Sequence, residues 1–479
     1  MVGKQVLTIS AADFAKGSSS SDYAQDGGFS PLSSGLNLNI KQGVVYSTPA
    51  PTDASANVAG VFIASCPNNG AGISSNRRNF LDSSANFYSL SGTTITKQAT
   101  GTKTYTYGLS DMISFQNIYY ASSINDVTQW SGTTITSETW FSVNSGTFGS
   151  LGNYPHPMIV YNKKLWIADG NYLHSFDGTT IVTEALIFDT NQVIYALGID
   201  PGTGQMLIST SLGPNASLSN PQLTAVWLFD GASSRPSRFI PTNDMALSFH
   251  SIGESVFVGM SRGIGIWTGA GIQMIHQFLN VGYDANFLPY KMHITNIGNI
   301  LYFVDGKQIF AYGEVQQVNN IWMRQVKVFY PCFQPITGAP VSSYIGLIAN
   351  VGSGALGVFY QTATPTNEFA ILDMTTAGSG GSLRSNRYEF PRPVVIHRIR
   401  VFTTGITNNT TGGQVGIYND ESNNTIVSAS SQMGIASGTQ YRFDFDFGGT
   451  KLQMAQFFAN IAPSGLGINR MVVYYDVAE

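Results

Sequence analysis

The sequence is poor in charge. Asp, Glu, Lys and Arg make up only 11% of its 479 residues, against about 25% in a typical soluble domain. The 24 basic and 28 acidic residues leave a formal net charge of −4. The nearest approach to a basic patch is the pair Arg77–Arg78, which we expect to cap a loop. Without a basic stripe, sequence-independent nucleic-acid binding is not expected, and no sequence-specific nucleic-acid partner is predicted.

Cysteines and long apolar runs are also scarce. Cys66 and Cys332 lie far apart, each in an apolar stretch, so we expect buried thiols rather than a disulfide scaffold. No stretch approaches the roughly 20 apolar residues that span a bilayer, so no membrane partner is expected. The N-terminus lacks the apolar core of a secretory signal, which favours a protein made in a cytoplasm and kept there, or assembled into something released by lysis.

What the sequence has in abundance is a repeat of short apolar runs rich in β-branched and aromatic residues. Hydrophobic residues make up 43% of the chain, with 51 Gly, 23 Tyr and 29 Phe. Strand-length runs of this kind are typical of strands buried on both faces. They recur every few tens of residues, at 61–64, 118–121, 165–168, 206–209, 256–259, 301–304 and 357–360.

A turn signal follows most of these runs. Ser-Gly or Asp-Gly stands between an aromatic-ending strand and a Thr-Ile strand at Gly92, Gly132 and Gly178, and related turns occur at Gly231 and Gly269. Glycine readily takes the positive φ that tight hairpins require. A repeat of about 40–50 residues with four strands predicts a β-propeller blade.

The predicted fold class is therefore all-β, with a β-propeller of about seven blades over residues 58–377. We expect each apolar run to form the inner strand of a blade. The residues expected to be buried in these strands are Ile63, Tyr120, Ile167, Ile208, Val258 and Phe303.

The two flanks differ from the repeat region. Residues 1–57 are loop-rich and predict an extended N-terminal arm, ordered by neighbouring subunits, whose inferred assembly residues are Phe29, Leu36, Leu38 and Ile40. Residues 378–385 begin Gly-Ser-Gly-Gly-Ser and predict a linker. Residues 386–479 contain six strand-like segments and predict a C-terminal β-sandwich or jelly roll.

Candidate chemistry is sparse. None of the six histidines has a partner at metal-ligand spacing, so neither a metal nor another cofactor is predicted. Hydrolysis of a glycan would require two carboxylates in one cleft. The candidates near strand ends are Asp126, Asp169, Asp200, Asp244, Glu254 and Asp305, with Trp140 as an aromatic that could hold a sugar. Turn formation is the commoner role for such acids, and packing for tryptophan.

In its architecture the chain resembles the β-propeller-bearing nozzle or tail-tip adaptor proteins of tailed bacteriophages. The features that carry the resemblance are the arm with Asp26-Gly27-Gly28-Phe29-Ser30-Pro31, the degenerate Ser/Asp-Gly-Thr-Thr repeats and the terminal β-rich segment. The resemblance implies a non-enzymatic structural subunit of the virion, made in the host cytoplasm. Its partners would be copies of itself in a ring and other tail proteins, with DNA passing through passively. The alternative is a glycan-binding or glycan-degrading propeller, an adhesin or depolymerase.

Overall fold

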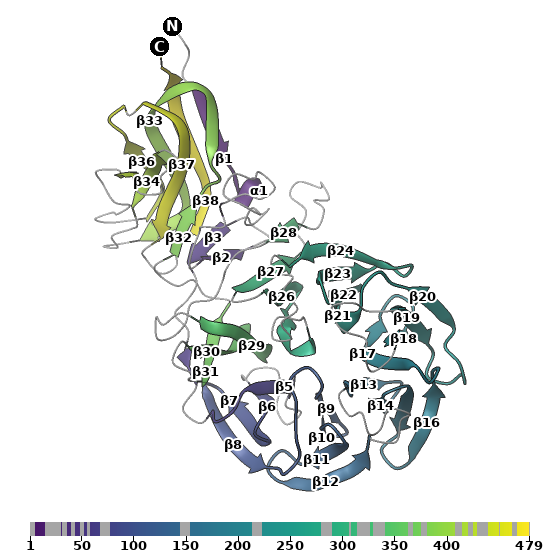
Figure 1. Ribbon diagram of the computed structural model, residues 1–479. Coiled ribbons are helices and arrows are strands. Elements are labelled where there is room, and N and C mark those ends of the chain that lie inside the picture. Colours follow the sequence, from purple (N-terminus) through teal and green to yellow (C-terminus); the bar gives the residue numbers. More distant parts are fainter. Residues whose placement is uncertain are drawn as a thin grey trace. The chain divides into compact units, whose positions relative to one another are not determined.

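The computed structural model describes residues 5–14, 30, 36–39, 44–47, 52–54, 58–67, 77–143, 154–212, 223–278, 290–305, 308–313, 326–328, 341–362, 367–374, 381–407, 414–419, 425–428, 439–449, 451–461 and 467–478. Almost every element in these residues is a β-strand (Figure 1). The chain forms two compact units. One comprises Thr52–Lys307 and Pro335–Leu372, and the other comprises Met1–Pro51, Gln308–Gln334 and Asp373–Glu479.

Seven four-stranded antiparallel sheets follow one another along the chain and form the blades of a β-propeller. The first four blades are β5 (Phe62–Pro67), β6 (Arg77–Asp82), β7 (Asn86–Ser91), β8 (Thr94–Thr100); β9 (Met112–Phe115), β10 (Ile118–Ser122), β11 (Asp126–Trp130), β12 (Ile135–Ser142); β13 (Met158–Tyr161), β14 (Lys164–Asp169), β15 (Tyr172–Phe176), β16 (Ile181–Ile187); and β17 (Gln192–Asp200), β18 (Gln205–Leu212), β19 (Ala225–Phe229), β20 (Arg238–Pro241).

The last three blades complete the circle. They are β21 (Ala246–Ile252), β22 (Ser255–Met260), β23 (Gly263–Trp267), β24 (Ile272–Gln277); β25 (Ile294–Ile297), β26 (Ile300–Asp305), β27 (Gln308–Gly313), β28 (Val326–Val328); and β29 (Val341–Gly352), β30 (Ala355–Thr362), β31 (Asn367–Asp373), β4 (Thr52–Asp53). A short 3-10 helix, η3 (Lys291–His293), leads into β25.

The first strand of each blade contacts the first strand of the next, and β29 closes the ring on β5. Figure 1 shows these first strands around the middle and the fourth strands β8, β12, β16, β20 and β24 at the rim. The seventh blade takes its fourth strand from the N-terminal side, where β4 pairs with β31 in the registers Ala370↔Asp53 and Ile371↔Thr52. Closure therefore joins the two ends of the repeat region.

The predicted seven-bladed propeller is confirmed, but one detail of the strand assignment is wrong. Apart from the run at 61–64, which lies in or beside the first strand β5, the apolar runs form the second strand of each blade and not the inner strand. A second strand has neighbours on both edges and blades on both faces, so its side chains are buried throughout. The six residues expected to be buried are each at most 2% exposed.

The predicted hairpin turns connect the third and fourth strands of five blades. Gly92, Gly132, Gly178, Gly231 and Gly269 all have positive φ, between 65° and 106°. This backbone conformation is strained for residues with a side chain, which explains why glycine recurs at these turns.

The other unit is built on one ten-stranded sheet. Besides β27 and β28, which pair in blade 6, its described elements are β1 (Gln5–Ile9), α1 (Ala11–Phe14), β2 (Leu36–Asn39), β3 (Val44–Ser47), β32 (Gly381–Arg384), β33 (Tyr388–Thr407), β34 (Val415–Asn419), β35 (Thr425–Ser428), β36 (Thr439–Asp446), β37 (Lys451–Ile461) and β38 (Gly467–Val477). The long strand β33 pairs with β36, β37 and β38 in turn. Six predicted strands are present, while the sandwich arrangement stays a prediction.

The N-terminal segment differs from the expected arm ordered by neighbouring subunits, because its described strands pair within their own chain. Strand β1 pairs with β38 over five residues, and β3 pairs with β38 at Val45↔Ile468. Phe14 and Val45 are fully buried. The external subunits that we expected to order this segment are therefore not needed for these strands, since β38 supplies backbone partners and the sheet's core covers the side chains.

The predicted linker differs as well. Residues 381–384 form β32, in which Gly381 pairs with Ile461 and Leu383 is fully buried. Ladder hydrogen bonds use only the backbone, so a glycine- and serine-rich composition does not prevent a strand where an edge and an apolar anchor are available. Residues 378–380 lie outside the described residues.

Candidate functional site

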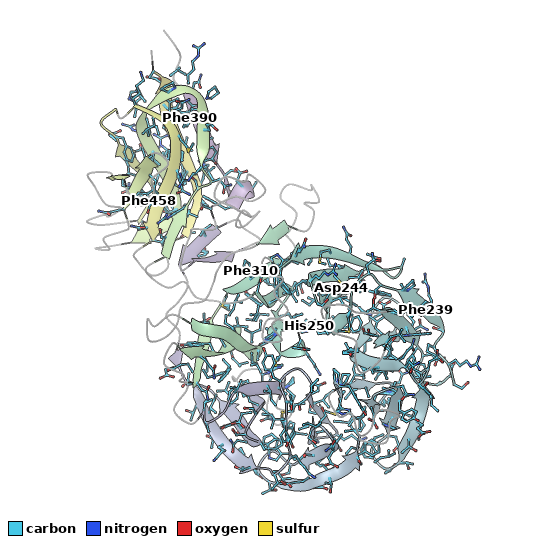
Figure 2. The ribbon with its side chains drawn as sticks, viewed as in Figure 1. Phe239, Asp244, His250, Phe310, Phe390 and Phe458 are labelled. Carbon is cyan, nitrogen blue, oxygen red and sulfur yellow. The ribbon has the colours of Figure 1, made fainter. Side chains whose placement is uncertain are left out.

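The first strands of the propeller surround a cavity of about 510 Å³. Residues from β5, β13, β17, β21, β25 and β29 line it, together with residues immediately before β9 and residues of the η3 segment. Figure 2 shows the His250 side chain of β21 near the middle of the ring and Phe239 of β20 at the rim. A volume in the range of about 300–1,000 Å³ is typical of small-molecule sites, so this cavity is the candidate functional site.

Asp111 and Lys291 form an ion pair in the cavity wall. The Lys291 Nζ lies 2.9 Å and 2.8 Å from the two carboxylate oxygens of Asp111. The same carboxylate accepts the backbone N–H groups of Met112 at 2.7 Å and Met158 at 2.9 Å. Asp111 is therefore held in place and neutralised, and it ties blade 2 to blade 3.

Arg78 is the second cation of the cavity. From β6 its Nε donates to Ser65 Oγ at 3.0 Å, and its Nη1 donates to the Asn350 carbonyl at 3.0 Å. No carboxylate pairs with it within the described ranges. Burial lowers the pKa of Arg78 to about 10, so the guanidinium keeps its charge at neutral pH. We expected Arg78 to cap a loop, but it is a strand residue whose side chain lines the cavity.

His250 completes the polar wall. Its Nε2 lies 2.8 Å from Asn296 Oδ1, and Asn350 Nδ2 donates to the Asn296 carbonyl at 2.7 Å. Burial lowers the pKa of His250, and the nearby charges of Arg78 and Lys291 lower it further, against the raising effect of its bond to Asn296. The imidazole is therefore neutral at pH 7, with Nε2–H donating to Asn296 and Nδ1 left as an acceptor.

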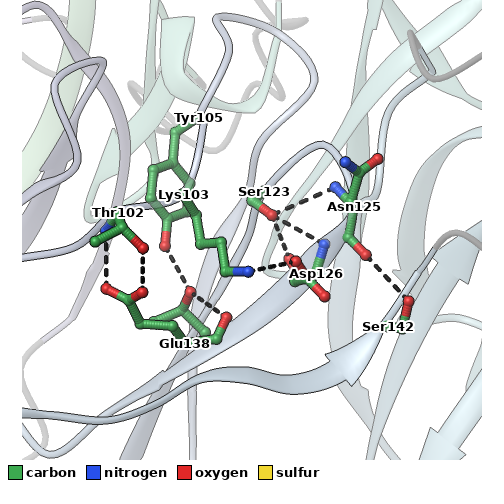
Figure 3. Close-up of polar contacts among 9 residues, drawn as sticks. Thr102, Lys103, Tyr105, Ser123, Asn125, Asp126, Glu138 and Ser142 are labelled. Atoms are coloured by element: carbon green, nitrogen blue, oxygen red, sulfur yellow. Dashed lines mark hydrogen bonds and ion pairs between the residues drawn. The ribbon is translucent and has the colours of Figure 1, made fainter.

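The glycan-site candidate Asp126 lies outside this cavity, at the start of β11 (Figure 3). Its carboxylate pairs with Lys103 Nζ at 2.9 Å, and its backbone N–H donates to Ser123 Oγ at 2.9 Å. Glu138 of β12 beside it accepts the backbone N–H of Thr102 at 2.8 Å. These contacts hold the segment between β8 and β9 against blade 2, so Asp126 and Glu138 have a structural role.

Asp169 and Asp305 also lie outside the cavity lining, on blades 3 and 6. Asp169 is fully buried and accepts the Tyr154 hydroxyl at 3.2 Å, and the Nε2 of His174 lies 3.4 Å from it. Asp305 Oδ2 lies 2.8 Å from His276 Nε2. The structure thus does not bring Asp126, Asp169 and Asp305 together in one described cavity.

The remaining candidates also lie outside the cavity lining. Trp140 of β12 contacts Tyr120 and Phe176, with ring centroids 4.8 Å and 4.9 Å away, and so packs blade 2 against blade 3. Asp200, Asp244 and Glu254 do not line the cavity. Asp200 accepts Gly202 N–H in its turn, and Asp244 accepts Met245 N–H ahead of β21.

The inferred arm residues divide between described and undescribed segments. Leu36 and Leu38 lie in β2, which pairs with β3 in the registers Leu36↔Ser47 and Leu38↔Val45. Phe29 and Ile40 lie outside the described residues. Strand β2 is the terminal strand of its sheet as far as the described elements show.

The described residues offer neither a metal-ligand cluster nor a membrane-spanning helix. In the described ranges no group of three or more His, Cys, Asp or Glu side chains is placed to hold a metal ion. Among the described helices none is long and apolar enough to cross a membrane. Burial raises the pKa of the Cys66 thiol to about 12, so this cysteine stays protonated.

The architecture defines a seven-bladed β-propeller protein. No family model and no curated protein matches the chain. Among solved structures it is similar to the Cps50 (Swd1) β-propeller domain of Myceliophteria thermophila, with 8% identity, a TM-score of 0.44 and coverage of 67% of this chain and 99% of that one. The C-terminal WD40 domain of Sif2 matches with 10% identity, a TM-score of 0.40 and coverage of 68% and 99%. BamB from Moraxella catarrhalis matches with 9% identity, a TM-score of 0.38 and coverage of 78% and 97%. At such identities the likeness concerns the fold alone.

Proposed function

We propose that this protein is a non-enzymatic structural subunit of a bacteriophage tail, present as several copies in a nozzle or adaptor ring around the DNA conduit. The observation that supports assembly is the sheet edge at β2. In the described part of the chain β2 pairs only with β3, so its other edge can accept a strand from a second copy. Exposed edges of this kind are templates for pairing between chains.

The non-enzymatic role is supported by the contacts of the candidate acids. Asp126, Asp169 and Asp305 each have a structural partner, namely Lys103, Tyr154 and His276 respectively. Asp111, the one carboxylate among the described residues that line the cavity, is bound by Lys291 and two backbone N–H groups. A general acid or nucleophile needs freedom to exchange a proton or attack a substrate.

The test is the oligomeric state of the full chain, measured by light scattering after size exclusion. The double variant Asn37→Lys/Asn39→Lys places charges along the edge strand, a device that blocks edge pairing. We expect the unmodified chain to form a closed ring and this variant to be monomeric. The matched control Thr93→Lys/Thr133→Lys, at exposed positions on propeller hairpins, should assemble normally.

A monomeric unmodified chain would contradict the proposal. Release of reducing ends from a capsular polysaccharide by the purified chain would contradict it too, and would favour the glycan-degrading alternative. Saturable binding to such a polysaccharide without cleavage would favour an adhesin.

A further inference from the structure

The cavity contains hydrogen-bonding groups that the protein itself leaves unused. Tyr195 and Tyr290 line it from β17 and from the segment before η3, and neither hydroxyl has a hydrogen-bond partner in the described ranges. Burial raises the pKa of Tyr195 to about 12 and raises that of Tyr290 as well, so both hydroxyls remain donors. Enclosed tyrosine hydroxyls usually find a partner.

Arg78 adds an unused charge to these hydroxyls. Its Nε and Nη1 are engaged by Ser65 and Asn350, while Nη2 makes no hydrogen bond within the described part of the protein. An enclosed guanidinium without a carboxylate partner is costly unless an anion compensates it. The Nδ1 acceptor of His250 lies in the same wall.

The charge of the wall sets the charge of a suitable ligand. Among the described residues its charged side chains are Arg78, Lys291 and Asp111, and the last two neutralise each other at 2.8 Å. With His250 neutral, one net positive charge remains. This matches a single carboxylate better than a phosphate, which carries more charge and is usually bound by several cations or a helix N-terminus.

The rest of the wall suits a hydroxylated carbon skeleton. Apolar side chains also line the cavity and can pack against C–H surfaces; they include Ile63, Leu109, Met158, Leu197, Phe249 and Ile348. The geometry points to a binding site for a small hydroxylated monocarboxylate of the sugar-acid class. Its carboxylate would pair with the Arg78 guanidinium, and its hydroxyls would hydrogen-bond with Tyr195, Tyr290 and His250.

This inference does not depend on the proposed role in a phage tail, because it concerns the propeller alone. The experiment is calorimetric titration of the full chain at pH 7 with D-glucuronate, and with D-glucose and inorganic phosphate for comparison. We expect saturable binding of glucuronate and at least tenfold weaker binding of the other two. A tenfold difference in affinity is about what the loss of one hydrogen bond to a charged group costs.

Variants locate the site. Arg78→Met should weaken glucuronate binding by about tenfold or more, and Tyr195→Phe and Tyr290→Phe by about two- to tenfold each. The tyrosine variants remove single oxygens, so they report on the site even where Arg78→Met does not fold. The matched controls Arg238→Met and Tyr441→Phe are at exposed positions on β20 and β36 and should bind as the unmodified chain does.

Absence of saturable glucuronate binding would overturn the inference. So would equal affinity for glucose, tighter binding of phosphate, or equal effects of the cavity variants and their controls. An oligosaccharide ending in glucuronate distinguishes the two sources of such a ligand. Tighter binding than the free acid would support the end of a polysaccharide chain, and weaker binding would support the free acid.

Discussion

An aromatic cluster packs across the seam between the first and seventh blades, which makes the seam a sensitive place to test the fold. Phe62 of β5 is fully buried. Its ring centroid lies 4.9 Å from that of Phe80, 5.2 Å from that of Phe359 and 5.6 Å from that of Phe369. The last two belong to blade 7. Phe62 therefore packs against both blade 1 and blade 7 and so contributes to ring closure.

Replacing Phe62 by alanine removes a fully buried ring and leaves a cavity that its aromatic neighbours cannot fill. Such a substitution costs about 3–5 kcal/mol, and at about 2 °C per kcal/mol for a domain of this size the melting temperature should fall by about 6–10 °C. Differential scanning calorimetry of the full chain measures this change.

The matched control is Phe239→Ala at the rim. Phe239 is 52% exposed and contacts Trp227 at a centroid distance of 4.7 Å, so its removal should lower the melting temperature by no more than about 3 °C. Equal effects of the two variants would refute the reasoning that ring closure depends on the Phe62 cluster.

Three other predictions concern separate parts of the chain. Deleting residues 1–47 removes β1 and β3, the partners of β38. We therefore expect a protease to cleave the C-terminal unit while the calorimetric unfolding transition of the propeller persists. Unchanged protease resistance would contradict this prediction. Asp177 accepts hydrogen bonds from three donors in its turn, and these bonds lower its pKa to about 2. The stabilisation is thus fully present above the unfolded pKa of about 3.9 and is lost as the pH falls through the folded pKa of about 2. Asp177→Ala should therefore lower the melting temperature at pH 7 and have a clearly smaller effect at pH 2. Arg400 donates two hydrogen bonds, of 2.6 Å and 3.0 Å, to the Asp444 carboxylate on a partly exposed face. A double-mutant cycle measured by urea unfolding should give a coupling free energy of about 0.5–1 kcal/mol. The coupling should be smaller in 1 M salt.

The sequence was sufficient to predict the propeller because its strongest signals are local. A second strand is buried on both faces, so a run such as 165–168 is entirely apolar. The glycine of each hairpin, as at Gly178 with φ 106°, is required by the turn itself. Both signals can be recognised within a few consecutive residues, and the spacing between them predicts the length of a blade.

The inner strands were assigned wrongly because they face the cavity. Strand β21 contains His250 and β25 contains Asn296, so their patterns are mixed and weaker than those of the second strands behind them. The N-terminal strands were misjudged for another reason. Their partner β38 lies more than 400 residues away in the chain, and pairing over that distance leaves no local pattern.

The candidate site could not be predicted for the same reason. Asp111 and Lys291 are separated by 180 positions, and Arg78 and Asn350 by 272. No spacing rule connects them, and only closure of the ring brings them together. Of these residues only Arg78 stands out in the sequence, as part of the Arg77–Arg78 pair. The residues next to it in sequence do not indicate what its side chain contacts in the fold.

Arg78 has two roles that must be separated. Its bond to the Asn350 carbonyl crosses the seam between blades 1 and 7, so it contributes to closure as Phe62 does. A seam contact alone, however, does not require a full charge, since a neutral donor would serve the Asn350 carbonyl and cost less to bury. In a chain with so few charges, the ligand that we propose would account for a guanidinium that lines a cavity without a carboxylate partner in the described ranges. If this is correct, glucuronate should raise the melting temperature of Phe62→Ala as it does that of the unmodified chain, while Arg78→Met should lose this stabilisation. Equal stabilisation of both variants by glucuronate would leave Arg78 with the seam role only.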